Sequence, residues 1–117
     1  MDFVFEKQWR DFAKAISIKY DSEGPELDLQ GLLFLIGVQE LGQGYRSFKK
    51  DEKLALMHIA ICALLKPYGY YTLEGLDQDG WPHYTNAKKL PALSQDEQEK
   101  LMKTAVMEYF ADYLVEQ

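Results

Sequence analysis

Two apolar stretches decide the fold of this chain: LLFLIGV at residues 32–38 and LALMHIAICALL at residues 54–65. A helix on a protein surface shows one apolar stripe, whereas a helix that is apolar on nearly every side needs cover from several directions. We therefore expect these two segments to pair at the centre of the domain. The flanking segments, or a second copy of the chain, must supply the cover.

The composition is typical of one globular domain that spans residues 1–117 and forms a core without a disulfide. Nineteen acidic and 13 basic residues give a formal net charge of −6, which disfavours binding to the phosphate backbone of nucleic acids. The N-terminus lacks the basic start and apolar run of a signal peptide. Both apolar stretches are shorter than the roughly 20 residues that span a membrane. We therefore expect a cytoplasmic protein without a nucleic-acid or membrane partner.

Four helices are predicted, over residues 3–20, 28–42, 50–66 and 95–116. The first and last are amphipathic, and the last opens with the capping box Ser94-Gln95-Asp96-Glu97. Asp28 is expected to cap the second helix, and Gly42 supplies the left-handed backbone that ends it. Lys103 is expected on the solvated side of the last helix.

Two glycines, Gly31 and Gly37, fall inside the second predicted helix. Each destabilises a helix by about 1 kcal/mol relative to alanine. A close approach of another helix would explain them, and so would the absence of any constraint at these positions. The sequence leaves both explanations open.

A β-hairpin is predicted over residues 70–86. Its signal is Asp79-Gly80 between segments rich in β-forming residues, and Pro82 makes the returning strand an edge. The predicted fold class is therefore mainly α: a compact four-helix, bundle-like domain with a small β-hairpin inserted between helices 3 and 4. Because an isolated hairpin is marginally stable in water, this one should lie against the helices.

Six rings gather in and beside the predicted hairpin, and they are the main candidates for a functional surface: Tyr68, Tyr70, Tyr71, Trp81, His83 and Tyr84. Tyrosine and tryptophan are enriched at protein interfaces. The same side chains could line a ligand pocket, with His58 as a further member, or simply pack against the end of the helices.

Four cations surround the start of the third predicted helix and are candidates for binding an anion: Arg46, Lys49, Lys50 and Lys53. Backbone N–H groups at a helix N-terminus favour phosphate or carboxylate. The glycine and lysine spacing of a phosphate-binding loop is absent, however, so an ordinary connector with solvated lysines is the alternative.

His58 and Cys62 lie four residues apart, on one face of the third predicted helix. This spacing suits two ligands of a metal ion or a thiol beside a base. We expect both residues to serve the core instead, and we predict no catalytic residue, no metal and no cofactor.

The predicted function is that of a small non-enzymatic interaction or adaptor protein that uses the aromatic hairpin surface. The alternative is a small-molecule-binding protein or minor enzyme with a pocket between hairpin and helices. A homodimer is also predicted, because two amphipathic helices leave part of the central pair uncovered.

Overall fold

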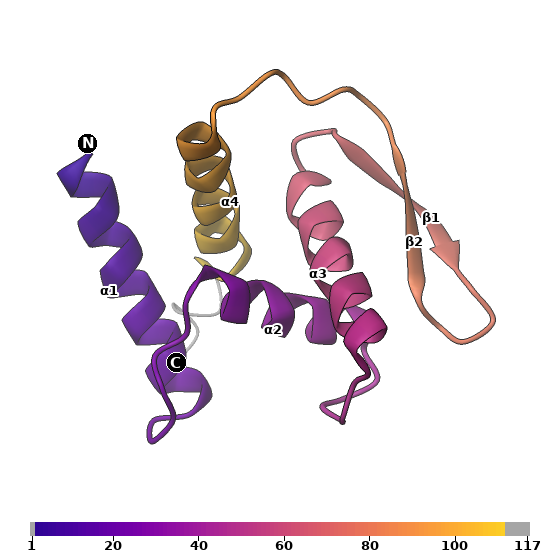
Figure 1. Cartoon of the computed structure of the whole chain (residues 1–117), viewed down its shortest axis with the longest axis horizontal. Coiled ribbons are helices and arrows are strands. Elements are labelled where there is room, and N and C mark those ends of the chain that lie inside the picture. The colour runs from indigo at the N-terminus through magenta and orange to yellow at the C-terminus, as the bar shows by residue number, and fades with distance from the viewer. Residues whose placement is uncertain (1, 112–117) are drawn as a thin grey trace.

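The computed structural model describes residues 2–111 (Figure 1). Its helices and strands follow in the order α1 (Phe3–Tyr20), α2 (Leu29–Leu41), α3 (Lys50–Leu65), β1 (Tyr71–Leu76), β2 (Pro82–Asn86) and α4 (Gln95–Tyr109). The predicted fold class is confirmed: four helices, with a two-stranded antiparallel hairpin between the third and the fourth. The end of the predicted fourth helix, residues 112–116, lies outside the described residues.

The helix ends are held by the caps that the sequence predicts. The Asp28 carboxylate accepts the Gly31 N–H at 2.8 Å, and Gly42 ends α2 with a φ of +72°. At the start of α4, the Ser94 hydroxyl accepts the Glu97 N–H at 3.1 Å, and the Glu97 carboxylate accepts the Ser94 N–H at 2.9 Å. Such caps satisfy backbone groups that have no partner inside the helix.

Two helices, α2 and α3, approach each other closely at Gly37 of α2. A Cβ atom at this position would come within 2.3 Å of the backbone oxygen of Leu56 in α3. At Gly31 a Cβ would meet only side-chain atoms, with Leu27 nearest at 3.2 Å. Of the two explanations that the sequence leaves open, close helix packing therefore holds at Gly37 and not at Gly31.

The buried apolar side chains form two cores. The main core unites the four helices and includes Trp9, Ile16, Leu32, Ile36 and Val106. The second core consists of Val38, Leu41, Phe48 and Leu56, with Phe34 and Trp81 packed against it. Leu32, Ile36 and Leu56 are completely buried, so the two apolar stretches do lie at the centre of the described chain.

Lys103 corrects one expectation, since it is buried and not solvated. Its Nζ lies 5.4 Å from the centre of the Trp9 ring and 3.6 Å from a carboxylate oxygen of Glu6. The methylene stem of lysine packs well against apolar surface, and its charge is attracted to the face of an indole. The periodicity of the α4 sequence could not reveal that Lys103 is buried, because Trp9 and Glu6 belong to α1.

Figure 1 shows α2 crossing the lower ends of α3 and α4, both of which it contacts. The hairpin lies on the side of α3 that faces away from α4, and both of its strands contact α3. The chain thus presents the hairpin at one edge of the molecule, next to the connection between α2 and α3.

The contact at Gly37 predicts opposite outcomes for two glycine substitutions. Gly37→Ala should lower the free energy of unfolding by about 2 kcal/mol, because the added methyl group forces α2 and α3 apart. Gly31→Ala should change it by less than about 1 kcal/mol, because only flexible side chains must move and alanine favours the helix. Urea denaturation of both variants measures the difference. Equal values would contradict the close approach.

Candidate functional site

The hairpin presents one apolar face that is only partly covered. Leu73 pairs with Tyr84 and Leu76 with Pro82, and a β-bulge between Leu73 and Gly75 adds one residue to β1. Tyr84 and Pro82 are two residues apart in β2 and share a face, so the two leucines opposite them share it too. Pro82 is buried on this face, whereas Leu73 is 39% exposed and Leu76 is 67% exposed. On this face Pro82 is therefore covered, whereas the two leucines of β1 are open.

The turn of the hairpin is organised by one carboxylate. Asp77 Oδ1 accepts the N–H groups of Asp79 at 2.9 Å and Trp81 at 3.0 Å, and its Oδ2 lies 2.9 Å from His83 Nε2. The contact with His83, and then the backbone hydrogen bond from Trp81, lower the pKa of Asp77 below its ordinary value of 3.8. The Gln43 amide also donates to the Asp79 carbonyl at 2.8 Å, which ties the turn to the connection between α2 and α3.

Trp81 is half-buried and packs against the second core. This ring, one of the six that the sequence offers as candidates for a functional surface, thus anchors the hairpin to α2 and α3. A large aromatic ring on a short hairpin supplies much of the buried area available to it. The large apolar residues of the hairpin that remain exposed are the two leucines of β1, Leu73 and Leu76.

A cavity of about 300 Å³ lies between the hairpin and α3. Three predicted site residues of the hairpin line it, Trp81, His83 and Tyr84, together with His58 of α3. Tyr71 also reaches α3, with its ring edge-on to the His58 imidazole at a centroid distance of 6.5 Å. Burial, together with the nearby charge of Glu40, raises the pKa of Tyr84.

The two remaining rings of the predicted set lie elsewhere. Tyr68 donates a hydrogen bond from its hydroxyl to the Glu108 carboxylate of α4. The ring of Tyr70 lies under the Lys88 ammonium group, at 4.6 Å from the ring centre, and lines a separate hollow beside α4. Both residues precede the hairpin, and a strand advances about 3.3 Å per residue, which separates them from the turn that holds Trp81.

His58 and Cys62 do lie together, with the Cys62 sulfur 3.5 Å from His58 Nε2. The expectation that both belong to the core is correct for Cys62 and wrong for His58, whose side chain is exposed at the surface of α3 beside the hairpin. Cys62 is completely buried, and this burial raises its pKa to about 11. The thiol is therefore neutral at physiological pH, and a neutral thiol is a poor nucleophile and a poor metal ligand. Within residues 2–111, no group of three or more His, Cys, Asp or Glu side chains is placed to hold a metal ion.

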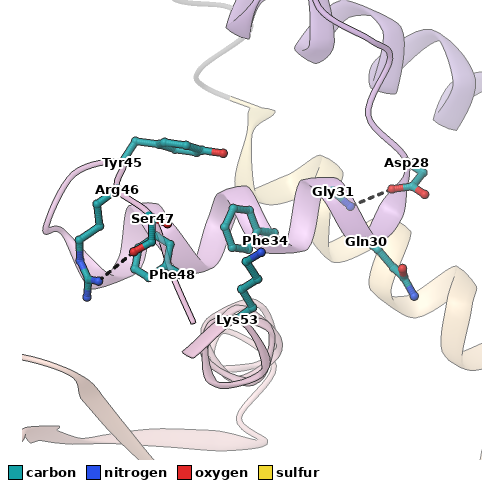
Figure 2. A pocket seen from close by; sticks show the side chains of 9 residues that line it. All are labelled: Asp28, Gln30, Gly31, Phe34, Tyr45, Arg46, Ser47, Phe48 and Lys53. Atoms are coloured by element: carbon teal, nitrogen blue, oxygen red, sulfur yellow. Dashed lines mark hydrogen bonds between the residues drawn. The ribbon is translucent and has the colours of Figure 1, made fainter. Parts of the chain in front are cut away.

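The four predicted anion-binding cations divide into two pairs. Arg46 and Lys53 line a hollow of about 770 Å³ between the start of α2 and the connection that leads to α3 (Figure 2). Lys49 and Lys50 do not line this hollow. At the start of α3, the Lys49 N–H is bonded to the Glu52 carboxylate at 2.8 Å, so an acidic side chain of the protein already lies at this helix end.

Sequence reasoning missed the aromatic walls of this hollow, which are Phe34, Tyr45 and Phe48. In the sequence, Phe34 stands out only as one residue of the apolar stretch 32–38, which predicts a buried helix and no binding site. A local signal existed in the segment Tyr45-Arg46-Ser47-Phe48, where aromatic and cationic residues are interleaved. That the Phe34 ring packs against both Tyr45 and Phe48 is visible only in the tertiary structure, because Phe34 belongs to a different segment of the chain.

None of the helices formed by residues 2–111 combines the length and the apolar character needed to traverse a lipid bilayer. Comparison of the chain with protein-family models, with curated proteins and with solved structures finds no match.

The carboxylate of Asp77 makes the hairpin turn sensitive to acid. Because the pKa of Asp77 in the folded protein lies below 3.8, its stabilising effect is present above this pH and is lost as the pH falls through the lowered value. We expect the amide resonances of Asp79 and Trp81 to shift in this range in an NMR titration, and Asp77→Asn to abolish that transition. The amides of Ile36 and Leu56 report global unfolding. A wild-type titration without the local transition would contradict this role of Asp77.

The burial of Cys62 predicts a thiol that does not react in the folded protein. An alkylating reagent at mildly alkaline pH should leave the native chain unmodified and should label one site after unfolding in urea, since Cys62 is the single cysteine. Mass spectrometry counts the label. Rapid alkylation of the native chain would instead mark Cys62 as an accessible, ionised thiol.

Proposed function

We propose that this chain is a non-enzymatic interaction protein that binds another protein through the exposed leucines of its hairpin, Leu73 and Leu76. One observation carries the proposal: Leu73 and Leu76 share a face of the hairpin, and on this face they remain 39% and 67% exposed although α3 packs against other residues of the hairpin. A partner that covers these leucines would complete an apolar face that the described chain leaves open.

The anchoring of the hairpin supports this proposal, because a fixed surface loses less conformational entropy on binding. Gln43 holds the turn through the Asp79 carbonyl, and Trp81 is set into the second core. At the end of the hairpin opposite the turn, the Ala87 N–H donates to the Tyr70 carbonyl at 3.0 Å and keeps the two strands together.

The chemistry of the hairpin also defines the partner. Within residues 2–111 the sheet has two strands, so β1 has one edge without a neighbouring strand. An extended segment can pair with such an edge, and its alternate side chains then cover the exposed leucines. Glu74, Asp77 and Asp79 are exposed on the hairpin. The partner segment is therefore extended and apolar, and carries lysine or arginine beside its apolar side chains.

A binding role also fits the state of the single cysteine, Cys62. The Cys62 thiol is buried and neutral next to His58, which does not favour covalent catalysis. His83 and Asp77 are engaged in holding the turn.

The cavity between hairpin and α3 favours a second candidate function, the binding of a small molecule. Its volume of about 300 Å³ is at the lower end of the range for ligand pockets, and Trp81, His83 and Tyr84 line it. A compound that raises the melting temperature of the wild type but not that of His58→Gln would support this function. The hairpin leucines would then have no effect on binding.

Site-specific crosslinking in cells tests the proposed function. With Leu76 replaced by a photo-crosslinking amino acid, we expect one protein to be captured through an extended apolar and basic segment. A synthetic peptide of that segment should bind the purified chain, with an affinity that falls as salt increases. Leu76→Ser should weaken this binding by about tenfold.

Ile18 provides the matched control, because it is an apolar residue on α1 that is 52% exposed. A crosslinker at this position should not capture the same protein, and Ile18→Ser should leave the peptide affinity unchanged. Equal capture at both positions would contradict a specific hairpin surface. Capture of a second copy of this chain at Leu76 would replace the proposed partner with the homodimer that the sequence predicts.

A further inference from the structure

We propose that the hollow between the start of α2 and the connection to α3 binds a small aromatic anion, such as an aromatic carboxylate, sulfonate or phosphate. This site is separate from the hairpin leucines and does not depend on the proposed protein partner. Its evidence is the combination of aromatic walls with a cation that has no ion-pair partner among residues 2–111.

Three rings form the apolar part of the site. Phe34 meets Tyr45 and Phe48 edge-on, with centroid distances of 6.4 and 6.0 Å and interplanar angles of 85° and 84°. Phe48 is buried in the second core and fixes the position of Phe34, whereas Tyr45 is 71% exposed. A flat ring of a ligand can pack against Phe34 and Tyr45 in the same offset or edge-on geometry.

Lys53 supplies the charge that an anion requires. It lies in the first turn of α3, and Figure 2 shows its side chain extending from α3 toward the hollow that Phe34 also lines. Within residues 2–111, no carboxylate lies within ion-pair distance of its ammonium group. An anionic ligand that packs on Phe34 could therefore pair its negative group with Lys53, the lining cation that has no carboxylate partner among residues 2–111.

Arg46 is already engaged and defines the border of the site. Its guanidinium group lies 3.5 Å from a Glu52 carboxylate oxygen and 4.3 Å from the centre of the Phe48 ring, and it donates to the Ser47 carbonyl at 3.3 Å. These contacts hold it in one position beside the aromatic walls. Because the charge of Arg46 is paired with that of Glu52, the positive charge in the lining that stays unpaired within residues 2–111 is that of Lys53.

The one carboxylate in the lining lies at the opposite end. Asp28 caps α2 and accepts the Gly31 N–H at 2.8 Å, and Figure 2 shows it at the far end of the hollow from Tyr45. Its charge disfavours an anion at that end. The charges therefore orient a ligand with its negative group toward Lys53 and its ring toward Phe34 and Tyr45. The volume of about 770 Å³ suits a small molecule.

A matched pair of probes tests the site: naphthalene-2-sulfonate and its neutral counterpart, naphthalene-2-sulfonamide. In an NMR titration of the full chain, the sulfonate should shift the amide resonances of Gly31 and Ser47. The sulfonamide should bind about tenfold more weakly, because it lacks the charge that pairs with Lys53.

Three variants separate the two parts of the site. Lys53→Gln should weaken binding of the sulfonate about tenfold and leave the sulfonamide unchanged. Tyr45→Ala should weaken both probes, and the exposure of this side chain means that the fold does not depend on it. Lys49→Gln is the control, since Lys49 is a neighbouring cation outside the hollow, and it should change neither affinity.

Three results would overturn the proposal. The first is equal affinity of the wild type for both probes, which would show that no charge is recognised. The second is an equal loss of sulfonate binding in Lys53→Gln and Lys49→Gln, which would indicate attraction to the net charge of the region and not to a defined site. Shifts confined to the hairpin amides would likewise place the ligand elsewhere.

Discussion

The contact between Gly37 and the backbone of Leu56 is the constraint on which the rest of the structure depends. Because Gly37 has no side chain, α2 and α3 approach until a Cβ atom would lie within 2.3 Å of the Leu56 oxygen. This proximity brings Val38 and Leu41 of α2 against Leu56 and closes the second core. A larger residue at position 37 would separate the two helices where that core begins.

Both candidate surfaces are built outward from the second core. Trp81 connects it to the hairpin, and Phe48 connects it to the hollow that contains Phe34 and Tyr45. The exposed leucines of β1 and the cation Lys53 therefore belong to rigid surroundings, although neither is itself buried. Rigid surroundings of this kind reduce the entropy lost when a partner or ligand binds.

Much of the fold could be predicted, while only parts of the candidate sites could be. Caps such as Asp28 and the Ser94–Glu97 box act within one turn of helix, so local sequence specifies them. The hairpin followed from Asp79-Gly80 in the same way. The predicted aromatic set was divided instead, with Tyr68 and Tyr70 beside α4 and Trp81, His83 and Tyr84 beside α3, because neighbours in sequence diverge along an extended strand.

The sequence by itself determined the four helices, their caps, the hairpin and the central place of the two apolar stretches, since each rests on periodicity or on contacts a few residues apart. Only the tertiary structure decided that Gly37 and not Gly31 marks a helix contact, that Lys103 is buried over Trp9, and that Lys53 lines the same hollow as Phe34 and Tyr45. These facts depend on which faces of distant segments meet. These contacts are set by the packing of side chains from different helices and strands, and a local sequence pattern does not predict them.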